Sequence, residues 1–184
     1  TAGFDAAGDL LQRFDLEAGM RVPVHTLAGL LHADFRSPSA VDYTTFLRAT
    51  RFLTRSQVEV NQAYARAVFN VVFNNRDDHP KNLSYRLGRD RTWRLAPAYD
   101  LTYSPGPGGE HQMDVCGEAR AVGRAALLAL ARLGGVDTAV AKSILDRALT
   151  VAGTFAERAQ SHPIRRRTVK VISAAIEGHR RMLG

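Results

Sequence analysis

Three polar side chains have the types and the spacing that phosphoryl transfer requires. Asp77 and Asn82 lie five positions apart in the segment NNRDDHPKN (residues 74–82), and Asp100 ends the segment APAYD (residues 96–100). In phosphoryl transfer, one carboxylate orients the attacking hydroxyl and accepts its proton, while an amide and a second carboxylate hold magnesium on the nucleotide phosphates. We therefore expect Asp77 to be the base, and Asn82 and Asp100 to bind Mg²⁺ together with ATP.

The residues around Asp77 leave several roles open. The spacing of five to Asn82 favours Asp77 over the adjacent Asp78 as the base, because the catalytic loop of protein kinases has the same spacing. We expect Asp78 to point elsewhere, as a cap or into solvent. Lys81 could neutralise charge on the transferring phosphate. His79 could orient Asp77, contact phosphate or only hydrogen-bond the loop. A polar loop of Asx turns with a salt bridge is the non-catalytic alternative.

The elements around the motif could bring these residues together. Apolar spacing predicts a helix over 42–53, capped by Asp42, and a buried helix from about Ser56 to the two asparagines at 74–75. The segments 83–87 and 92–95 read as two strands joined by a turn. Such a hairpin would return the chain, so that Asp100 could come near Asn82.

The rest of the chain is predicted to be mainly helical. Residues 9–16 read as a short strand that runs into a connection, 20–24 as extended, and Thr26 as the cap of a short helix that ends at residue 31. The Pro- and Gly-rich segment SPGPGG (104–109) predicts a loop without helix. Further helices are expected over 120–133, 137–160 and 163–183, with Gly134 and Gly135 ending the first, Asp137 capping the second and Pro163 in the first turn of the third.

Composition sets outer limits on the function. The 184 residues suit one domain or one large lobe, and a hydrophobic content of 45% can build a core. The net charge of +7 favours acidic partners such as nucleotides, nucleic acids or acidic proteins. The basic group Arg165, Arg166, Arg167 and Lys170 could contact nucleic acid, or could form a solvated helix face.

The location of the protein is predicted from what the sequence contains. No apolar run approaches the length of a membrane span, and the first residues do not resemble a signal peptide. A single cysteine, Cys116, cannot form an internal disulfide and is expected to be a small buried residue. We therefore expect a cytoplasmic protein without a membrane partner.

Three segments resemble one known family. NNRDDHPKN, LAPAYDLTYS (95–104) and GPGGEH (106–111) are similar to the HipA family of serine/threonine kinases, the toxins of bacterial toxin–antitoxin pairs. The resemblance begins near Leu11 and fades in the C-terminal helices. It implies an α+β fold that is predominantly α-helical: the C-terminal lobe of a protein-kinase-like fold, with a small β-hairpin that carries the metal site.

The resemblance also implies roles for individual residues. Asp77 would be the catalytic base, and Asn82 and Asp100 the metal ligands. The stretch QRFD (12–15) resembles the hinge between two kinase lobes, where backbone groups meet the adenine. Family members usually have an acidic residue where Gln12 stands. The residues expected to line the nucleotide site are Gln12, Arg13, Phe14, Asp15, His79, Lys81, Asn82, Tyr99 and Asp100.

Parts of a complete kinase are missing from the sequence. No G-x-G-x-x-G loop and no lysine precede residue 77 to hold the α- and β-phosphates. We therefore expect residues 1–16 to be the last strand and hinge of a missing N-terminal lobe, and 17–184 to be the helical C-terminal lobe. The chain would be either cut from a longer kinase or a natural fragment that needs a partner. Alone, it is expected to bind nucleotide weakly or not at all and to transfer no phosphate.

Three functions can be compared. The favoured one is phosphate transfer from MgATP to a protein hydroxyl, for which the resemblance suggests an aminoacyl-tRNA synthetase as substrate, a DNA-binding antitoxin as partner and only indirect contact with DNA. The second is a non-catalytic, pseudokinase-like binding module or corepressor, which would not need Asp77, Asn82 and Asp100 together. The third, a metal-dependent phosphohydrolase built on Asp78 and His79, is disfavoured because the other histidines lack metal-ligand spacing. The GPGGEH loop, which ends at His111, is expected either to contact the protein substrate in the place of an activation segment or to be an exposed flexible loop.

Overall fold

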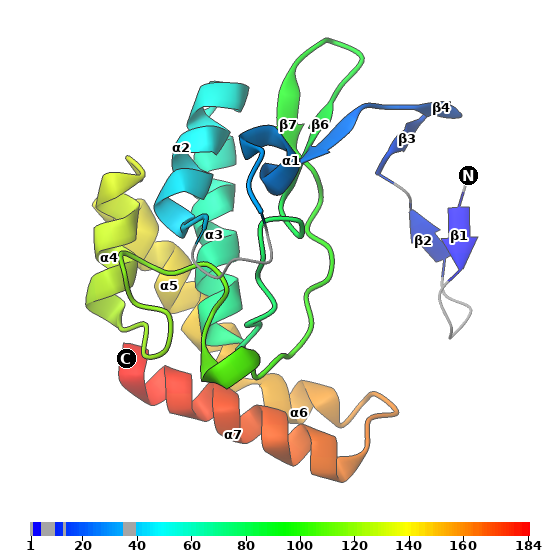
Figure 1. Ribbon diagram of the computed structural model, residues 1–184. Coiled ribbons are helices and arrows are strands. Elements are labelled where there is room, and N and C mark those ends of the chain that lie inside the picture. The colour runs from blue at the N-terminus through cyan, green and yellow to red at the C-terminus, as the bar shows by residue number, and fades with distance from the viewer. Residues whose placement is uncertain (1, 5–9, 13, 35–39) are drawn as a thin grey trace.

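The chain folds into a body of helices with a small antiparallel sheet along one side (Figure 1). The computed structural model describes residues 2–4, 10–12, 14–34 and 40–184, with side chains from Phe14 onward. Its helices are α1 (Leu27–Leu31), α2 (Tyr43–Thr54), α3 (Gln57–Val72), α4 (Arg124–Leu133), α5 (Thr138–Gly153), α6 (Phe155–Ala159) and α7 (Arg166–Leu183). Its strands are β1 (Ala2–Phe4), β2 (Leu10–Gln12), β3 (Leu16–Glu17), β4 (Met20–Arg21), β5 (Val24–Thr26), β6 (Ser84–Leu87) and β7 (Trp93–Leu95). The predicted α+β class with helices as its main element is confirmed at this level.

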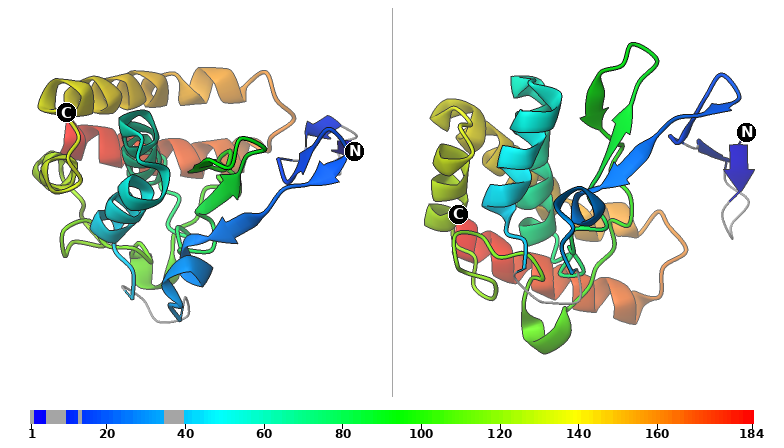
Figure 2. Two further views of the ribbon diagram at one scale, coloured as in Figure 1. Left: turned by 90° about the horizontal axis from the view of Figure 1, so that it is seen from above. Right: turned by 45° about the horizontal axis from the view of Figure 1, so that its top comes forward.

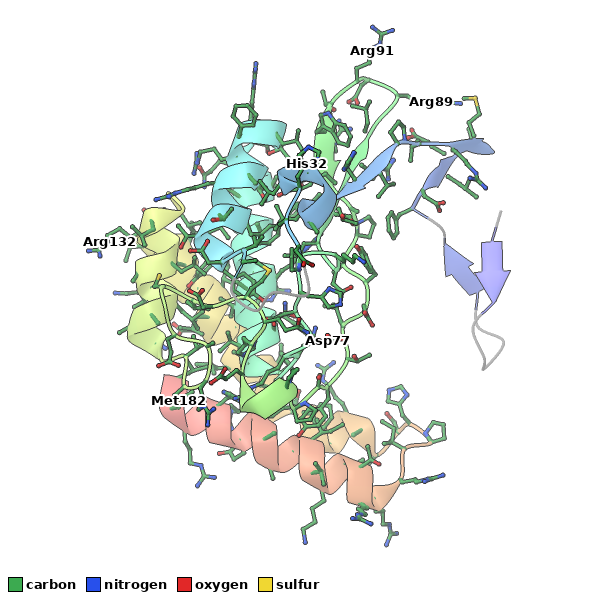
Figure 3. All side chains as sticks on the ribbon, viewed as in Figure 1. His32, Asp77, Arg89, Arg91, Arg132 and Met182 are labelled. Carbon is green, nitrogen blue, oxygen red and sulfur yellow. The ribbon has the colours of Figure 1, made fainter. Side chains whose placement is uncertain are left out.

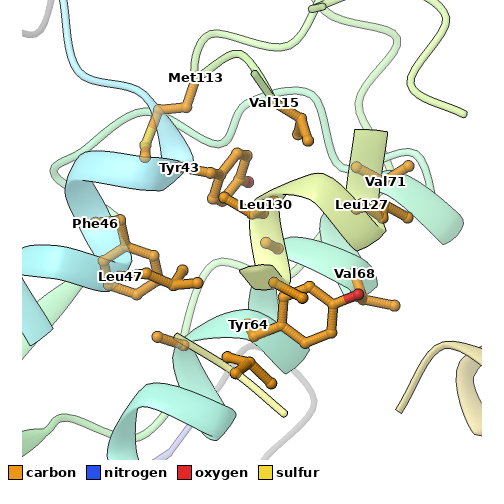
Figure 4. Close-up of a cluster of buried hydrophobic side chains, with 14 of the residues drawn as sticks. Tyr43, Phe46, Leu47, Tyr64, Val68, Val71, Met113, Val115, Leu127 and Leu130 are labelled. Atoms are coloured by element: carbon orange, nitrogen blue, oxygen red, sulfur yellow. The ribbon is translucent and has the colours of Figure 1, made fainter. Parts of the chain in front are cut away.

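Helix α3 forms the centre of the body. It begins at Ser56, whose hydroxyl accepts a hydrogen bond from the backbone N–H of Glu59, and α2 is capped in the same way by Asp42. Both predicted starts are confirmed. α3 packs against α2 on one side and α5 on the other. Its fully buried side chains include Tyr64, Val68 and Val71, which Figure 4 shows among residues of α2 and α4. A buried helix explains the apolar stripe seen in the sequence.

The predicted hairpin is present and belongs to a larger sheet. Strands β6 and β7 pair antiparallel, with Tyr85 opposite Leu95, and β5 adds a third strand on the other side of β6. The sequence did not predict this third strand. The Tyr85 hydroxyl lies 2.8 Å from the hydroxyl of Thr50, so a buried hydrogen bond joins the sheet to α2. Thr26 ends β5 and caps α1, as predicted for that helix.

The C-terminal helices depart from the sequence prediction at three points. α4 begins at Arg124 rather than near residue 120. The single helix expected over 137–160 breaks at Thr154, whose hydroxyl donates to the carbonyl of Val151 and tightens the last turn of α5. Pro163 lies outside α7, because the chain reverses direction between α6 and α7 (Figures 1 and 2). α7 then crosses one end of the body and packs on α3 and α5. Asp137 caps α5 as expected.

The N-terminal strands form two small pairs, β1 with β2 and β3 with β4. The β1–β2 pair lies apart from the helical body in the views of Figures 1 and 2. The β3–β4 pair is connected to the sheet by an ion pair of Glu17 with Arg86, 3.0 Å between Oε2 and Nη2. The division between residues 16 and 17 falls within β3 and stays a prediction. Among the described residues, no helix is both long and apolar enough to cross a membrane.

Candidate active site

The segment that follows α3 and the segment that follows β7 run side by side. The backbone N–H of Arg76 donates to the carbonyl of Ser104 at 3.2 Å, and the N–H of Ser104 donates to the carbonyl of Asn74 at 3.0 Å. Asn75 and Ser104 form an isolated parallel bridge. Two stretches that lie far apart in sequence are thereby held at a fixed register, which positions Asp77 and Asp100 in one region.

Asn82 and Asp100 are in direct contact. The Asn82 amide Nδ2 donates to Asp100 Oδ2 at 2.9 Å and to the backbone carbonyl of Asp77 at 3.0 Å. Asp100 adopts a left-handed backbone conformation, with φ of 54°, directly after the sheet. The side chains of Asn82 and Asp100 therefore meet, and Asn82 also contacts the backbone of Asp77. Their roles in catalysis and metal binding stay predictions.

The Asn82–Asp100 pair has the donor atoms that magnesium prefers. Amide and carboxylate oxygens are hard ligands, and Mg²⁺ in nucleotide sites commonly takes one or two protein ligands with phosphates and water. The Asp100 side chain is exposed and could reach such an ion. In the part of the chain that the structure describes, no group of three or more His, Cys, Asp or Glu side chains could hold a metal. The residues present fit an ion shared with a nucleotide rather than an all-protein metal site.

The Asp77 side chain, labelled in Figure 3, is half exposed. Its carboxylate has two polar neighbours. His79 Nε2 lies 3.7 Å from Asp77 Oδ1, so His79 can help to orient it, one of the roles considered from the sequence. The side-chain amide of Gln112 donates to the same oxygen at 2.8 Å. Gln112 lies 35 positions from Asp77, and nothing in the sequence indicated that it would be near.

Asp78 does not cap a helix or face solvent, so that expectation was wrong. Its side chain is fully buried, and its Oδ2 accepts a hydrogen bond from the Tyr43 hydroxyl at 2.7 Å. Oδ1 accepts the backbone N–H of Gln112 at 2.8 Å. Burial, and next the charge of Asp78, raise the pKa of Tyr43 well above its usual value. Asp78 is the centre of an internal polar cluster one residue away from Asp77.

The SPGPGG loop is exposed or half-buried, and its contact with a protein substrate stays a prediction, but His111 that follows it is buried. Only 1% of its side chain is exposed, and Nδ1 lies 2.7 Å from Asp78 Oδ2. The SPGPGG loop before it contains a short 3₁₀ turn, Pro107–Gly109, where no helix was predicted. Arg76 holds this loop through hydrogen bonds to the carbonyls of Gly109 and Arg120. Burial lowers the pKa of Arg76 from its usual value. Arg76, which follows α3 in sequence, therefore contacts the chain both before and after His111.

The predicted hinge approaches the site through one aromatic pair. The rings of Phe14 and Tyr99 are stacked, with centroids 5.7 Å apart and an interplanar angle of 20°. The Tyr99 hydroxyl donates to the carbonyl of Lys81 at 2.6 Å and lies 2.5 Å from the hydroxyl of Ser84. Burial raises the pKa of Tyr99. Tyr99 thus contacts both the Phe14 ring and the backbone of Lys81, and the nucleotide-binding role of these residues stays a prediction.

The structure says little about the nucleotide contacts predicted for the remaining hinge residues. Asp15 accepts a backbone hydrogen bond from Val22 at 2.9 Å. The Gln12 side chain and all of Arg13 lie outside the described residues. Their predicted contacts with adenine stay predictions.

Cys116 lies in a different environment from the one predicted, and the contact made by His179 was not predicted. Cys116 is exposed rather than buried, because it occupies a tight turn with φ of 55° between Val115 and Glu118. His179 of α7 reaches the start of the segment 74–82, where Nε2 lies 2.8 Å from Asn74 Oδ1. Burial, aided by the charge of Arg76, lowers the pKa of His179 to about 4. The histidine therefore stays neutral at pH 7 and fastens α7 to the loop.

Comparisons with known proteins agree with this architecture. Residues 4–161 match the family model described as the HipA-like C-terminal domain. No curated protein matches the chain. Among solved structures, the fold is similar to a chain of the complex of HipA, HipB and operator DNA from the toxin–antitoxin system of Shewanella oneidensis MR-1, with a TM-score of 0.72 and 17% identity. The match covers 98% of this chain and 49% of that chain, so the present chain spans about half of its length.

Proposed function

The chain belongs to the family of HipA-like C-terminal domains, and from this premise we propose that it is the catalytic lobe of a serine/threonine protein kinase. It would transfer the γ-phosphate of MgATP to a protein hydroxyl. One observation supports the proposal: the Asn82 amide donates to the Asp100 carboxylate at 2.9 Å and to the Asp77 backbone carbonyl at 3.0 Å, as expected if the base and the metal ligands belong to one site.

Each residue would have a distinct task. The Asp77 carboxylate would orient the acceptor hydroxyl and take its proton as the oxygen attacks the γ-phosphorus and ADP leaves. Asn82 and Asp100 would hold Mg²⁺, which when bound neutralises charge on the phosphates. Lys81 would offset charge on the transferring group. Phe14 and Tyr99, which stack on each other, would border the nucleotide near the hinge.

The structural neighbour suggests the partners. Its structure contains HipA, HipB and operator DNA. By analogy, we propose that the protein containing this chain binds a DNA-binding antitoxin and contacts DNA through that complex. The family resemblance suggests an aminoacyl-tRNA synthetase as the phosphorylated protein.

The test uses the full reading frame that contains this chain. The purified protein is incubated with Mg²⁺, ATP labelled on its γ-phosphate and an extract of its host, and labelled serine or threonine is identified in the acceptor. Asp77→Asn is expected to reduce the transfer rate by about 100-fold or more, since general-base catalysis contributes that much. Asp100→Asn is expected to raise the Mg²⁺ concentration needed for half-maximal rate.

A matched control separates catalysis from general damage. Asp90→Asn alters an exposed carboxylate that pairs with Arg94, far from Asp77 in the fold, and should transfer phosphate at the normal rate. If Asp77→Asn also transferred at the normal rate, the catalytic proposal would be abandoned in favour of a binding module.

A further inference from the structure

The Gln112 side chain donates a hydrogen bond to Asp77, the predicted base. Its Nε2 lies 2.8 Å from Asp77 Oδ1, closer than His79 Nε2 at 3.7 Å from the same atom. Asp77 is 48% exposed, and an exposed carboxylate without such a partner would rotate freely. Both contacts fall on Oδ1. Rotation of the Asp77 carboxylate is thereby limited.

The backbone beneath Gln112 is itself held by the residue next to Asp77. The backbone N–H of Gln112 donates to Asp78 Oδ1 at 2.8 Å, and His111 Nδ1 lies 2.7 Å from Asp78 Oδ2. The N–H of His111 donates to the carbonyl of Ala119 at 2.8 Å. Because Asp78 and His111 are almost completely buried, this arrangement is protected from water and fixed in place. Asp77 and Gln112 are therefore both held in place by the buried Asp78, which is adjacent to Asp77 in sequence and hydrogen-bonded to the Gln112 backbone.

The chemistry of the donor suits this role. An amide is neutral, so it orients the carboxylate without placing a cation against the group that must accept a proton. Catalytic groups need orientation within a fraction of an ångström, and a displacement of about 1 Å can cost about 100-fold in rate.

We propose that Gln112 is a positioning residue that orients the Asp77 carboxylate for phosphate transfer, with Asp78 and His111 as its buried support. The inference rests on the proposed kinase function. It adds to the proposed site a residue from the segment after the glycine-rich loop.

The experiment compares Gln112→Met with Gln112→Glu in the full reading frame, using MgATP and the acceptor found in the transfer assay. Methionine keeps the length of the side chain but has no donor, while glutamate replaces the donor with a negative charge beside Asp77. We expect kcat to fall about 10- to 100-fold for Gln112→Met and further for Gln112→Glu. The KM for MgATP should change less than about 2-fold, because the ATP-binding residues are untouched. Gln160→Met, at an exposed glutamine, is the control and should leave kcat unchanged.

The outcomes distinguish this inference from the function on which it rests. If Asp77→Asn leaves transfer intact, the kinase proposal fails. If Asp77→Asn removes transfer and Gln112→Met keeps the wild-type kcat, only the positioning role is wrong. A loss caused by misfolding would lower the thermal midpoint and raise the KM with the fall in kcat. In that case Gln112→Ser, which is smaller and also too short to reach Asp77, replaces the methionine variant, and a normal kcat for it would overturn the proposal.

Discussion

The Asp78 carboxylate and the His111 imidazole face each other in the interior, with Oδ2 2.7 Å from Nδ1. They lie 33 positions apart and join the loop that carries Asp77 to the segment that carries Gln112. A buried carboxylate is costly to desolvate, so it persists only when its lone pairs are satisfied. Three donors satisfy Asp78 in this way: the Tyr43 hydroxyl, His111 Nδ1 and the backbone N–H of the adjacent Gln112.

Asp78→Asn should destabilise the fold by about 2 to 4 kcal/mol. An amide has the same shape, but its NH₂ end would face a donor such as the Tyr43 hydroxyl or the Gln112 N–H. Urea unfolding followed by circular dichroism measures the change. Asp90→Asn is the matched control, since its carboxylate is exposed and should leave the midpoint nearly unchanged. Equal midpoints for Asp78→Asn and the wild type would contradict a structural role for Asp78.

Two buried tyrosines should respond oppositely to loss of the hydroxyl. The Tyr64 hydroxyl is buried without a hydrogen-bond partner among the described residues, and burial raises the pKa of Tyr64 to about 12. Tyr64→Phe removes this unsatisfied group and should be neutral or stabilising by up to about 1 kcal/mol. Tyr43→Phe removes the donor to Asp78 and should cost about 1 to 3 kcal/mol. Thermal midpoints of the two variants provide the comparison, and a larger loss for Tyr64→Phe would refute it.

The glycine-rich loop contains one position that cannot accept a side chain. Gly106 has φ of 72°, and a Cβ there would lie 2.3 Å from the carbonyl oxygen of Glu110. Gly108 also has positive φ, 64°, but its Cβ would meet open space. Gly106→Ala should therefore destabilise the chain clearly more than Gly108→Ala, which should cost about 1 kcal/mol of conformational strain. Differential scanning calorimetry can rank them. Equal costs would show that the loop rearranges freely.

The neutral state of His179 predicts a dependence of stability on pH. Its pKa is about 4 in the folded chain and about 6.5 when unfolded, so the unfolded chain binds the extra proton first. Stability is fully present above pH 6.5, falls as the pH drops from 6.5 to 4, and then levels off with respect to this group. The loss amounts to about 3 kcal/mol at 1.36 kcal/mol per pKa unit.

The His179 effect can be isolated by substitution. His179→Gln keeps an N–H for Asn74 Oδ1 and should flatten the decline of unfolding free energy between pH 6.5 and 4. His162→Gln, at an exposed histidine, should follow the wild-type curve. Denaturant unfolding at several pH values measures both. An unchanged slope for His179→Gln would place the source of acid sensitivity elsewhere.

The sequence alone predicted the features that depend on neighbouring residues. Thr26, Asp42 and Asp137 cap the helices where expected, because a capping side chain bonds to backbone groups two or three positions away. The β6–β7 hairpin followed from two short β-like segments around a turn. The residue types and spacing of Asp77, Asn82 and Asp100 also selected a group that the fold brings together.

Tertiary structure decided which of the remaining polar residues matter. In the folded chain, Asp78 and His111 form a buried pair. Gln112 contacts Asp77, and His179 contacts Asn74. Each of these contacts spans more than 30 positions, and its strength comes from the exclusion of water after packing. Residue type and local spacing do not identify such distant partners. The hydrogen bonds of caps and turns join residues only a few positions apart, so they can be predicted directly from the sequence.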